Sequence, residues 1–69
     1  MQIKIEYYVQ KIRRQRNLSL RQLEYMSGVS KSQIGAIEGG QCDPSVTTLC
    51  MLAEALGVSF SELFSYTRF

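Results

Sequence analysis

One short pattern of apolar and polar positions occurs three times along the chain. An apolar residue is followed by a serine, two further residues, a glutamine or glutamate and a second apolar residue, at 18–23, 29–34 and 58–63. A serine at the N-cap accepts a hydrogen bond from the amide three residues on, the Gln or Glu side chain reaches back to the serine amide, and the two apolar residues pack together. The pattern therefore predicts helices that begin after Ser19, Ser30 and Ser59.

Two further helices are predicted from apolar spacing. The run Asp43-Pro44-Ser45 supplies a helix start, capped by its aspartate or its serine, and an earlier helix ends near Asn17. Gly28, Gly57 and the pair at 39–40 stand where helix ends favour glycine. The apolar positions of these two helices are Val46, Leu49, Leu52, Ala53 and Leu56, and Ile5, Val9 and Ile12.

The N-terminal alternation Ile3-Lys4-Ile5 is compatible with a strand, but three residues are fewer than a typical strand contains. We interpret it as the lead-in to the first helix. The expected fold class is therefore all-α, a compact five-helix bundle. A chain of 69 residues is too short for two domains, so residues 1–69 are expected to form one.

The composition excludes several classes of function. The chain contains no histidine, which removes His-based acid–base catalysis, His-activated nucleophiles and His-ligated metal. Cys42 and Cys50 are separated by seven residues and form no CxxC pair; we interpret Cys42 as a loop residue and Cys50 as a small buried apolar residue. We expect no enzymatic activity, no metal, no cofactor and no small-molecule ligand.

The distribution of apolar and charged residues bears on location and partners. No apolar run approaches the ~20 residues that cross a bilayer, and the N-terminus lacks a signal peptide's apolar region, so we expect a cytoplasmic protein with no membrane partner. Residues 1–31 carry seven cations and two carboxylates, a net +5, whereas residues 32–69 carry one cation and four carboxylates, a net −3. A basic N-terminal half is compatible with an anionic partner, although basic residues on a helix also occur as a solvated face.

The second and third predicted helices have helix-turn-helix spacing, over about 19–39, because their serine caps are eleven residues apart. Ile34 and Ile37 are expected to pack inward, so the helix after Ser30 presents a different set outward. The outward side chains include short polar groups that can hydrogen-bond the edges of bases. Beside them, a flat Gly-Ala patch can contact thymine methyl groups, so this surface is compatible with binding in the major groove of DNA. A small-residue face that packs on a protein partner is the alternative. The outward set is Lys31, Ser32, Gly35 and Ala36, with Gln33 at its edge.

A series of further residues occurs in an order and spacing more specific than any single motif. They are Leu18-Ser19, Leu23, Gly28-Val29-Ser30, Ile34, Ile37-Glu38, Gly40, Asp43-Pro44-Ser45, Leu49, Leu52-Ala53, Ala55-Leu56-Gly57-Val58 and Glu62-Leu63-Phe64. With them, the segment from Ile5 to Phe64 resembles the five-helix Cro/repressor-type, or XRE-like, helix-turn-helix domain of phage and bacterial transcription regulators. The resemblance implies a lambda-repressor-like bundle whose third helix enters the major groove of double-stranded operator DNA.

The resemblance also implies roles for individual positions. Contacts with base edges fall to Lys31, Ser32, Gln33 and Ala36; contacts with the DNA backbone fall to Arg13, Ser19, Leu20, Ser30 and Gln41; and Arg13 is expected to form an ion pair with Glu38. Three places depart from the family pattern. Leu20 replaces a phosphate-binding glutamine, Glu24 replaces an alanine, and the loop at 41–43 lacks a basic residue.

Size favours a homodimer, because a domain this small makes few base contacts and a two-fold dimer reads two half-sites ~34 Å apart in a pseudo-palindromic operator. The C-terminal tail, 60–69, has more aromatic surface than a short fifth helix can bury, so its rings either form a dimer contact or cap the core. The predicted function is a sequence-specific DNA-binding transcription regulator, a repressor; the alternative is a protein-interaction module of the antitoxin or antirepressor kind. The predicted dimer residues are Phe60, Phe64, Tyr66 and Phe69.

Overall fold

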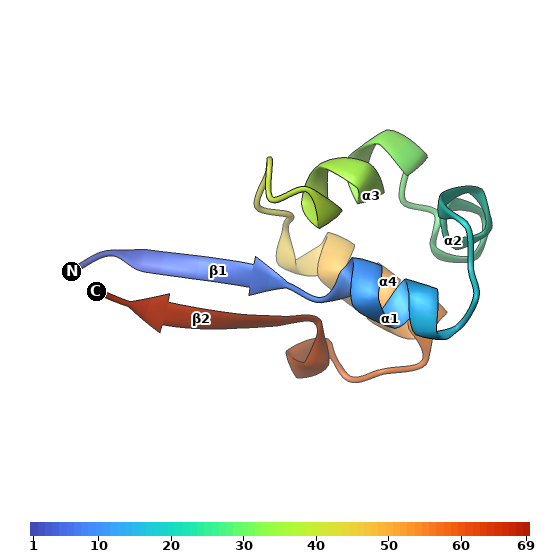
Figure 1. Cartoon of the computed structure of the whole chain (residues 1–69). Coiled ribbons are helices and arrows are strands. Elements are labelled where there is room, and N and C mark those ends of the chain that lie inside the picture. Colours follow the sequence, from blue (N-terminus) through green and yellow to red (C-terminus); the bar gives the residue numbers. More distant parts are fainter.

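The computed structural model describes all 69 residues as a small helical body from which a two-stranded ribbon projects (Figure 1). The body contains four α-helices and one 3₁₀ helix, and the ribbon is formed by the two ends of the chain. In chain order the elements are β1 (Ile3–Tyr7), α1 (Val9–Gln15), α2 (Leu20–Ser27), α3 (Lys31–Glu38), α4 (Val46–Leu56), η1 (Phe60–Leu63) and β2 (Phe64–Arg68).

The serine-capped helices begin where the pattern predicts. Ser19 Oγ accepts a hydrogen bond from the Gln22 amide at 3.0 Å, and Gln22 Oε1 accepts from the Ser19 amide at 2.7 Å. Ser45 caps α4 in the same way, by accepting from the amide three residues on. Gly28 and Gly57 end α2 and α4 with φ of 78° and 70°, a left-handed conformation that side chains rarely adopt. These predicted helix boundaries are confirmed.

The core lies where α1, α2, α3 and α4 meet. Helix α2 packs against both α3 and α4, and α1 contacts the same two helices from the other side. The apolar positions predicted for α1 and α4 are mostly in this core, although Val46 is 66% exposed because it begins α4 at the surface. The buried apolar residues are Val9, Ile12, Leu23, Val29, Ile34, Ile37, Leu49, Leu52, Ala53, Leu56 and Leu63.

The fold is mostly helical but is not the all-α five-helix bundle that the sequence predicts. Residues 3–5 belong to a strand, β1, which pairs antiparallel with β2 so that Ile5 lies opposite Tyr66. Hydrogen bonds between the Gln2 and Phe69 backbones extend the ladder to both chain ends. A strand whose partner lies at the opposite end of the chain leaves no short-range signal, which is why the lead-in interpretation was wrong.

The predicted fifth helix is also shorter than expected. It begins at Ser59 but comprises only one 3₁₀ turn, because Phe64 is already extended, with φ −154° and ψ 161°, and continues into β2. Two further expectations are wrong. The first helix begins at Val9, since Ile5 lies in the strand, and Cys50 is exposed on α4 rather than buried. Cys42 lies in the loop after α3, as predicted.

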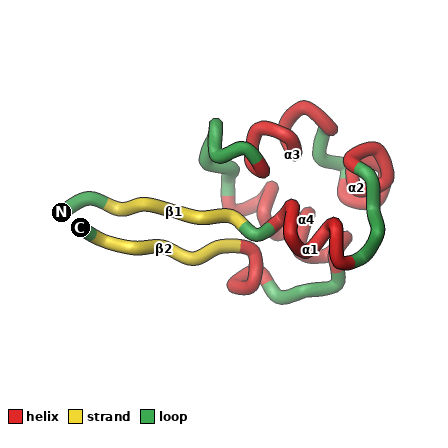
Figure 2. Tube along the Cα trace, in the orientation of Figure 1, coloured by secondary structure: helices red, strands yellow, loops and turns green.

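The ribbon gives the molecule its elongated shape, 38 × 22 × 20 Å. Figure 2 shows both strands leaving the helical body together, with the two termini side by side at the far end. Helix α3 lies on the side of the body that β1 borders (Figure 1). No helix is both long and apolar enough to cross a membrane.

Candidate nucleic-acid interface

One face of helix α3 packs on the core, and its opposite face is exposed. Ile34 and Ile37 are fully buried against the core, which fixes the rotation of the helix about its axis. Lys31, Ser32 and Gln33 are exposed in its first turn. Gly35 is open as well, since a Cβ there would meet no atom within 4 Å. The sequence-predicted base-contacting residues therefore lie together on one accessible surface, with Ala36 half-buried at its margin.

The start of α3 is held by two side chains. Ser30 Oγ accepts from the Gln33 amide at 3.1 Å, as an N-cap does. The carboxylate of Glu24, on the last turns of α2, accepts from the Lys31 amide at 2.8 Å. Glu24 occupies a position where the resemblance implies an alanine, so its carboxylate must either reach solvent or find a partner. Its carboxylate ties α2 to α3 and places a negative charge at the positive end of the α3 dipole.

The end of α3 is tied to α1 by an ion pair. Arg13 Nε lies 2.7 Å from Glu38 Oε2, and its Nη2 lies 3.0 Å from Oε1, so the guanidinium grips the carboxylate with two parallel bonds. Its Nη1 donates to the Leu18 carbonyl at 2.8 Å. The two side chains are only 10% and 5% exposed, and the hydrogen bond to Glu38 raises the pKa of Arg13. Arg13 is therefore placed to hold α3 in position.

The other residues expected at the DNA backbone lie at the starts of α2 and α3 and just after α3. Ser19 and Ser30 are exposed, whereas Leu20 is half-buried and packs on the core, so that only its amide is available to a phosphate. Gln41 is exposed, and its amide donates to the Ala36 carbonyl at 2.9 Å.

Exposed cations are concentrated in the N-terminal half of the chain. The pair Arg13–Glu38 is the one ion pair in the chain, so the remaining basic side chains have no carboxylate partner. Such unpaired charges are available to an anionic ligand. Those exposed on the helices of the N-terminal half are Lys11, Arg14, Arg21 and Lys31, and Arg16 is exposed just after α1.

The C-terminal aromatic residues divide into two groups. Phe60 and Phe64 are half-buried against the core and form an edge-to-face pair with ring centres 5.2 Å apart. Tyr66 and Phe69, on the ribbon, are 65% and 70% exposed. Thus two of the four rings cap the core, and two remain free for a contact.

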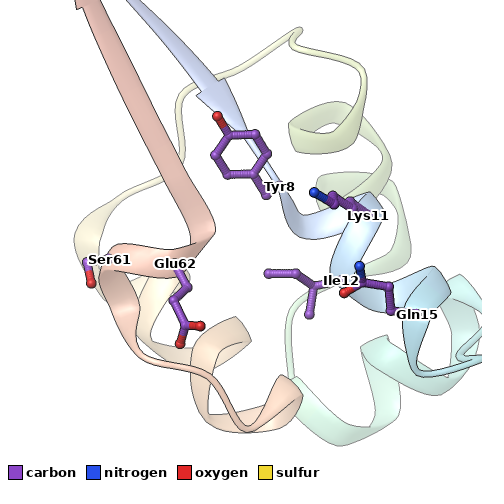
Figure 3. Close-up of a pocket in the computed structure, with 6 residues that line it drawn as sticks. All are labelled: Tyr8, Lys11, Ile12, Gln15, Ser61 and Glu62. Carbon is purple, nitrogen blue, oxygen red and sulfur yellow. The ribbon is translucent and has the colours of Figure 1, made fainter.

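A hollow lies between α1 and η1 on the helical body (Figure 3). Lys11 and Gln15 line it from α1, and Glu62 lines it from η1. The Glu62 carboxylate is already engaged, because it accepts from the Ser59 amide at 2.7 Å and from Ser59 Oγ at 2.9 Å; these bonds lower its pKa. Ser61 also lines the hollow, but its hydroxyl makes no hydrogen bond to Lys11 or Glu62. No three His, Cys, Asp or Glu side chains gather as a metal site.

Known proteins share this arrangement. The helix-turn-helix family HTH_3 matches residues 9–63. The chain is 40% identical over 57 residues to an uncharacterized HTH-type transcriptional regulator, y4dJ of Sinorhizobium fredii, covering 83% of this chain and 74% of y4dJ. It is 36% identical over 66 residues to MJ0272 of Methanocaldococcus jannaschii, another uncharacterized HTH-type transcriptional regulator, covering 96% of this chain and 94% of that protein. The match to the regulator SutR of Escherichia coli, 40% over 57 residues, spans only 32% of SutR.

Solved structures agree with the sequence relatives. The restriction-modification controller protein C.AhdI of Aeromonas hydrophila superposes with a TM-score of 0.76 at 31% identity, over 78% of this chain and 82% of C.AhdI. The transcriptional regulator VanUg superposes with a TM-score of 0.77 over all of this chain and 92% of VanUg. At 23% identity, VanUg supports the fold alone.

Proposed function

The chain belongs to the helix-turn-helix family of transcription regulators, and from that premise we propose that it is a repressor that binds double-stranded operator DNA of defined sequence. In this proposal it acts as a homodimer, and each copy inserts α3 into the major groove. DNA binding and regulation of transcription are what the family does. The binding to a defined operator, the insertion into the major groove and the repression of transcription are specific to the proposal.

The outward surface of α3 carries the proposal. Its inner isoleucines are fully buried, so the helix cannot turn to hide Lys31, Ser32 and Gln33. A lysine and a glutamine can each hydrogen-bond the edges of bases in the major groove. Gly35 leaves the backbone without a side chain there, which permits close approach to a base pair.

Phosphate contacts position such a helix, and the starts of α2 and α3 supply them. The amides of Leu20 and Ser32 donate no hydrogen bond within the chain, whereas those of Ser19, Gln22, Lys31 and Gln33 donate to side chains. Free amides at a helix start favour an anion. We assign to Ser19, Leu20, Ser30 and Gln41 a contact with the DNA backbone, and to Arg13 the positioning of α3 through Glu38.

The decisive experiment is selection from a pool of random duplexes, followed by titration of the selected duplex. We expect enrichment of one pseudo-palindromic sequence and at least ~10³-fold weaker binding to unrelated DNA at physiological salt. Lys31→Ala should weaken binding and make its salt dependence shallower, whereas Gln33→Ala should relax the preference at one base pair per half-site. Lys11→Ala, on α1, is the matched control for loss of a cation.

Two results contradict the proposal. One is a selection that enriches no sequence while the protein is folded. The other is an affinity that Lys31→Ala and Lys11→Ala reduce equally and that Gln33→Ala leaves unchanged, because non-specific attraction alone behaves in this way. A protein-interaction module of the antitoxin kind would give the first result.

A further inference from the structure

The ribbon has two chemically different faces. Opposite residues of an antiparallel pair point to the same face, and successive residues alternate. Ile5 pairs with Tyr66 and Ile3 pairs with Arg68, so these four residues lie on the same face of the ribbon, which is mostly apolar. Lys4 and Glu6, with Thr67 and Ser65 opposite them, occupy the other face.

The apolar face is uncovered along the outer ribbon. Ile3, Ile5 and Tyr66 are 47%, 38% and 65% exposed. Only the base of this face, Tyr7 and Phe64, packs against the helical body. An isolated two-stranded ribbon is marginally stable in water, so an uncovered apolar face at its far end is typical of a surface that packs on another protein surface.

We propose that a second copy of this chain covers this face, with the two ribbons packed face to face and antiparallel about a two-fold axis that passes beside Ile5. The inference supplies the surface for the dimer in the proposed function and rests on that function for its biological purpose. It adds Ile3 and Ile5 to the predicted interface and retains Tyr66, whereas Phe69, which pairs with Gln2, lies on the polar face.

The direction of the axis follows from the position of α3. Helix α3 lies on the β1 side of the body (Figure 1), so an axis in the plane of the ribbon and across its strands leaves the α3 helices of both copies on the same side. Each strand has five residues, so the ribbon occupies ~17 Å of the 38 Å length of the molecule. The two helical bodies are then separated by roughly 38 Å, close to the ~34–36 Å between half-sites one helical turn apart.

Charge supports the antiparallel orientation. Arg68, at the tip, is the only charged residue on the apolar face. In the antiparallel dimer it lies over Phe64 at the base of the other ribbon, one strand away from Tyr7, whose phenol bonds the exposed carboxylate of Asp43. That carboxylate has no cation partner. Edge-to-edge pairing of two β1 strands would place Lys4 opposite Glu6 of the other copy, a favourable charge pair, but would leave both apolar faces open.

Sedimentation equilibrium of the 69-residue chain without DNA tests the proposal. We expect a dimer at about 100 µM, and we expect Ile5→Thr combined with Tyr66→Thr to raise the dissociation constant about tenfold or more, because threonine keeps the strand propensity but removes apolar contact area. Lys4→Thr, on the other face, is the control and should change the constant less than about twofold.

Cross-linking gives a second readout on a ribbon with nearly native side chains. In a Cys42→Ser, Cys50→Ser background, Ile5→Cys should be joined by a bis-maleimide with a ~10 Å reach, the distance between packed sheets. Lys4→Cys, which faces away, should not be joined. Circular dichroism of each variant shows that it is folded.

The outcomes are distinct. A chain that stays monomeric, a dimer insensitive to the double threonine variant, or a dimer in which Lys4→Cys cross-links as well as Ile5→Cys overturns the face-to-face proposal. None of these depends on DNA. A face-to-face dimer that selects no duplex would leave this inference intact and would remove the proposed function, whereas a monomer that selects one sequence would do the reverse.

Discussion

Tyr7 donates a hydrogen bond to Asp43, with 2.8 Å between the phenol oxygen and the carboxylate. Tyr7 is the last residue of β1, and Asp43 lies in the loop between α3 and α4. The bond joins segments 36 residues apart, and it fixes the base of the ribbon to the loop that follows α3. The orientation of the ribbon relative to α3 therefore depends on this contact.

Replacement of Tyr7 by phenylalanine should lower the free energy of unfolding by about 1 kcal/mol at neutral pH, the usual contribution of one hydrogen bond. Burial, followed by the bond to Asp43, raises the pKa of Tyr7 from 10.0 to about 12. Because the folded state binds this proton more tightly, the contribution is complete below pH 10 and is lost as the pH rises from 10 to about 12.

Urea unfolding of both proteins at several pH values measures this prediction. The stability difference between the native chain and Tyr7→Phe should be constant below pH 10 and should shrink above it. Tyr25→Phe is the control, since Tyr25 is 89% exposed and makes no side-chain hydrogen bond. A difference that grows toward pH 12 would mean that the phenol contributes through something other than its proton.

Local patterns were sufficient for the helical body and insufficient for the ribbon. The caps at Ser19, Ser30 and Ser45 depend on residues within one helical turn, so the sequence shows them directly. Ile5 and Tyr66 are separated by 60 intervening residues, and neither strand has a turn signal that joins it to the other. Only the folded body brings the two ends of the chain together.

The candidate site shows the same division. The outward surface of α3 follows from its period, because Ile34 and Ile37 define the buried side. The pairing of Arg13 with Glu38 was implied by resemblance alone, since a separation of 25 residues carries no periodic signal. The bond from Glu24 to the Lys31 amide was not predicted, because it depends on the angle between α2 and α3 rather than on the spacing within either helix.

The Arg13–Glu38 pair should stabilise the domain far more than an exposed pair does. Arg13→Met leaves a carboxylate that is 5% exposed without its cation, which should cost about 3–5 kcal/mol of unfolding free energy or prevent folding. Arg14→Met, at the adjacent exposed position, should cost less than about 0.5 kcal/mol. Chemical denaturation of the variants measures both.

A double variant keeps this prediction testable if the single variant does not fold. Arg13→Met with Glu38→Leu removes both charges and should regain most of the lost stability, because apolar groups of similar size replace a buried pair with little penalty. A double variant as unstable as the sum of the two single changes would show that the two side chains are not coupled.

Glu24 is expected to stabilise the start of α3 and, at the same time, to lower the affinity for DNA. Glu24→Gln retains an oxygen that can accept from the Lys31 amide but removes a negative charge from the proposed DNA surface. Binding to the selected duplex should therefore tighten about two- to fivefold at low salt, and the gain should fade as salt screens it. Glu54→Gln, an exposed change on α4, is the control for net charge. Equal gains from both changes would contradict a local role for Glu24.

At position 35, the residue that would favour folding differs from the residue that favours DNA binding. A Cβ at this position meets no atom of the chain within 4 Å, and alanine is the better helix former, so Gly35→Ala should raise the unfolding free energy by about 0.5–1 kcal/mol. The same methyl group would stand between α3 and the bases, and overpacking there should weaken operator binding about tenfold. Thr47→Ala, which also favours a helix but lies exposed on α4, should stabilise without loss of binding. If Gly35→Ala stabilises the protein and binds the operator as tightly as the native chain, the outward surface of α3 does not approach the bases closely, and another surface must read the DNA.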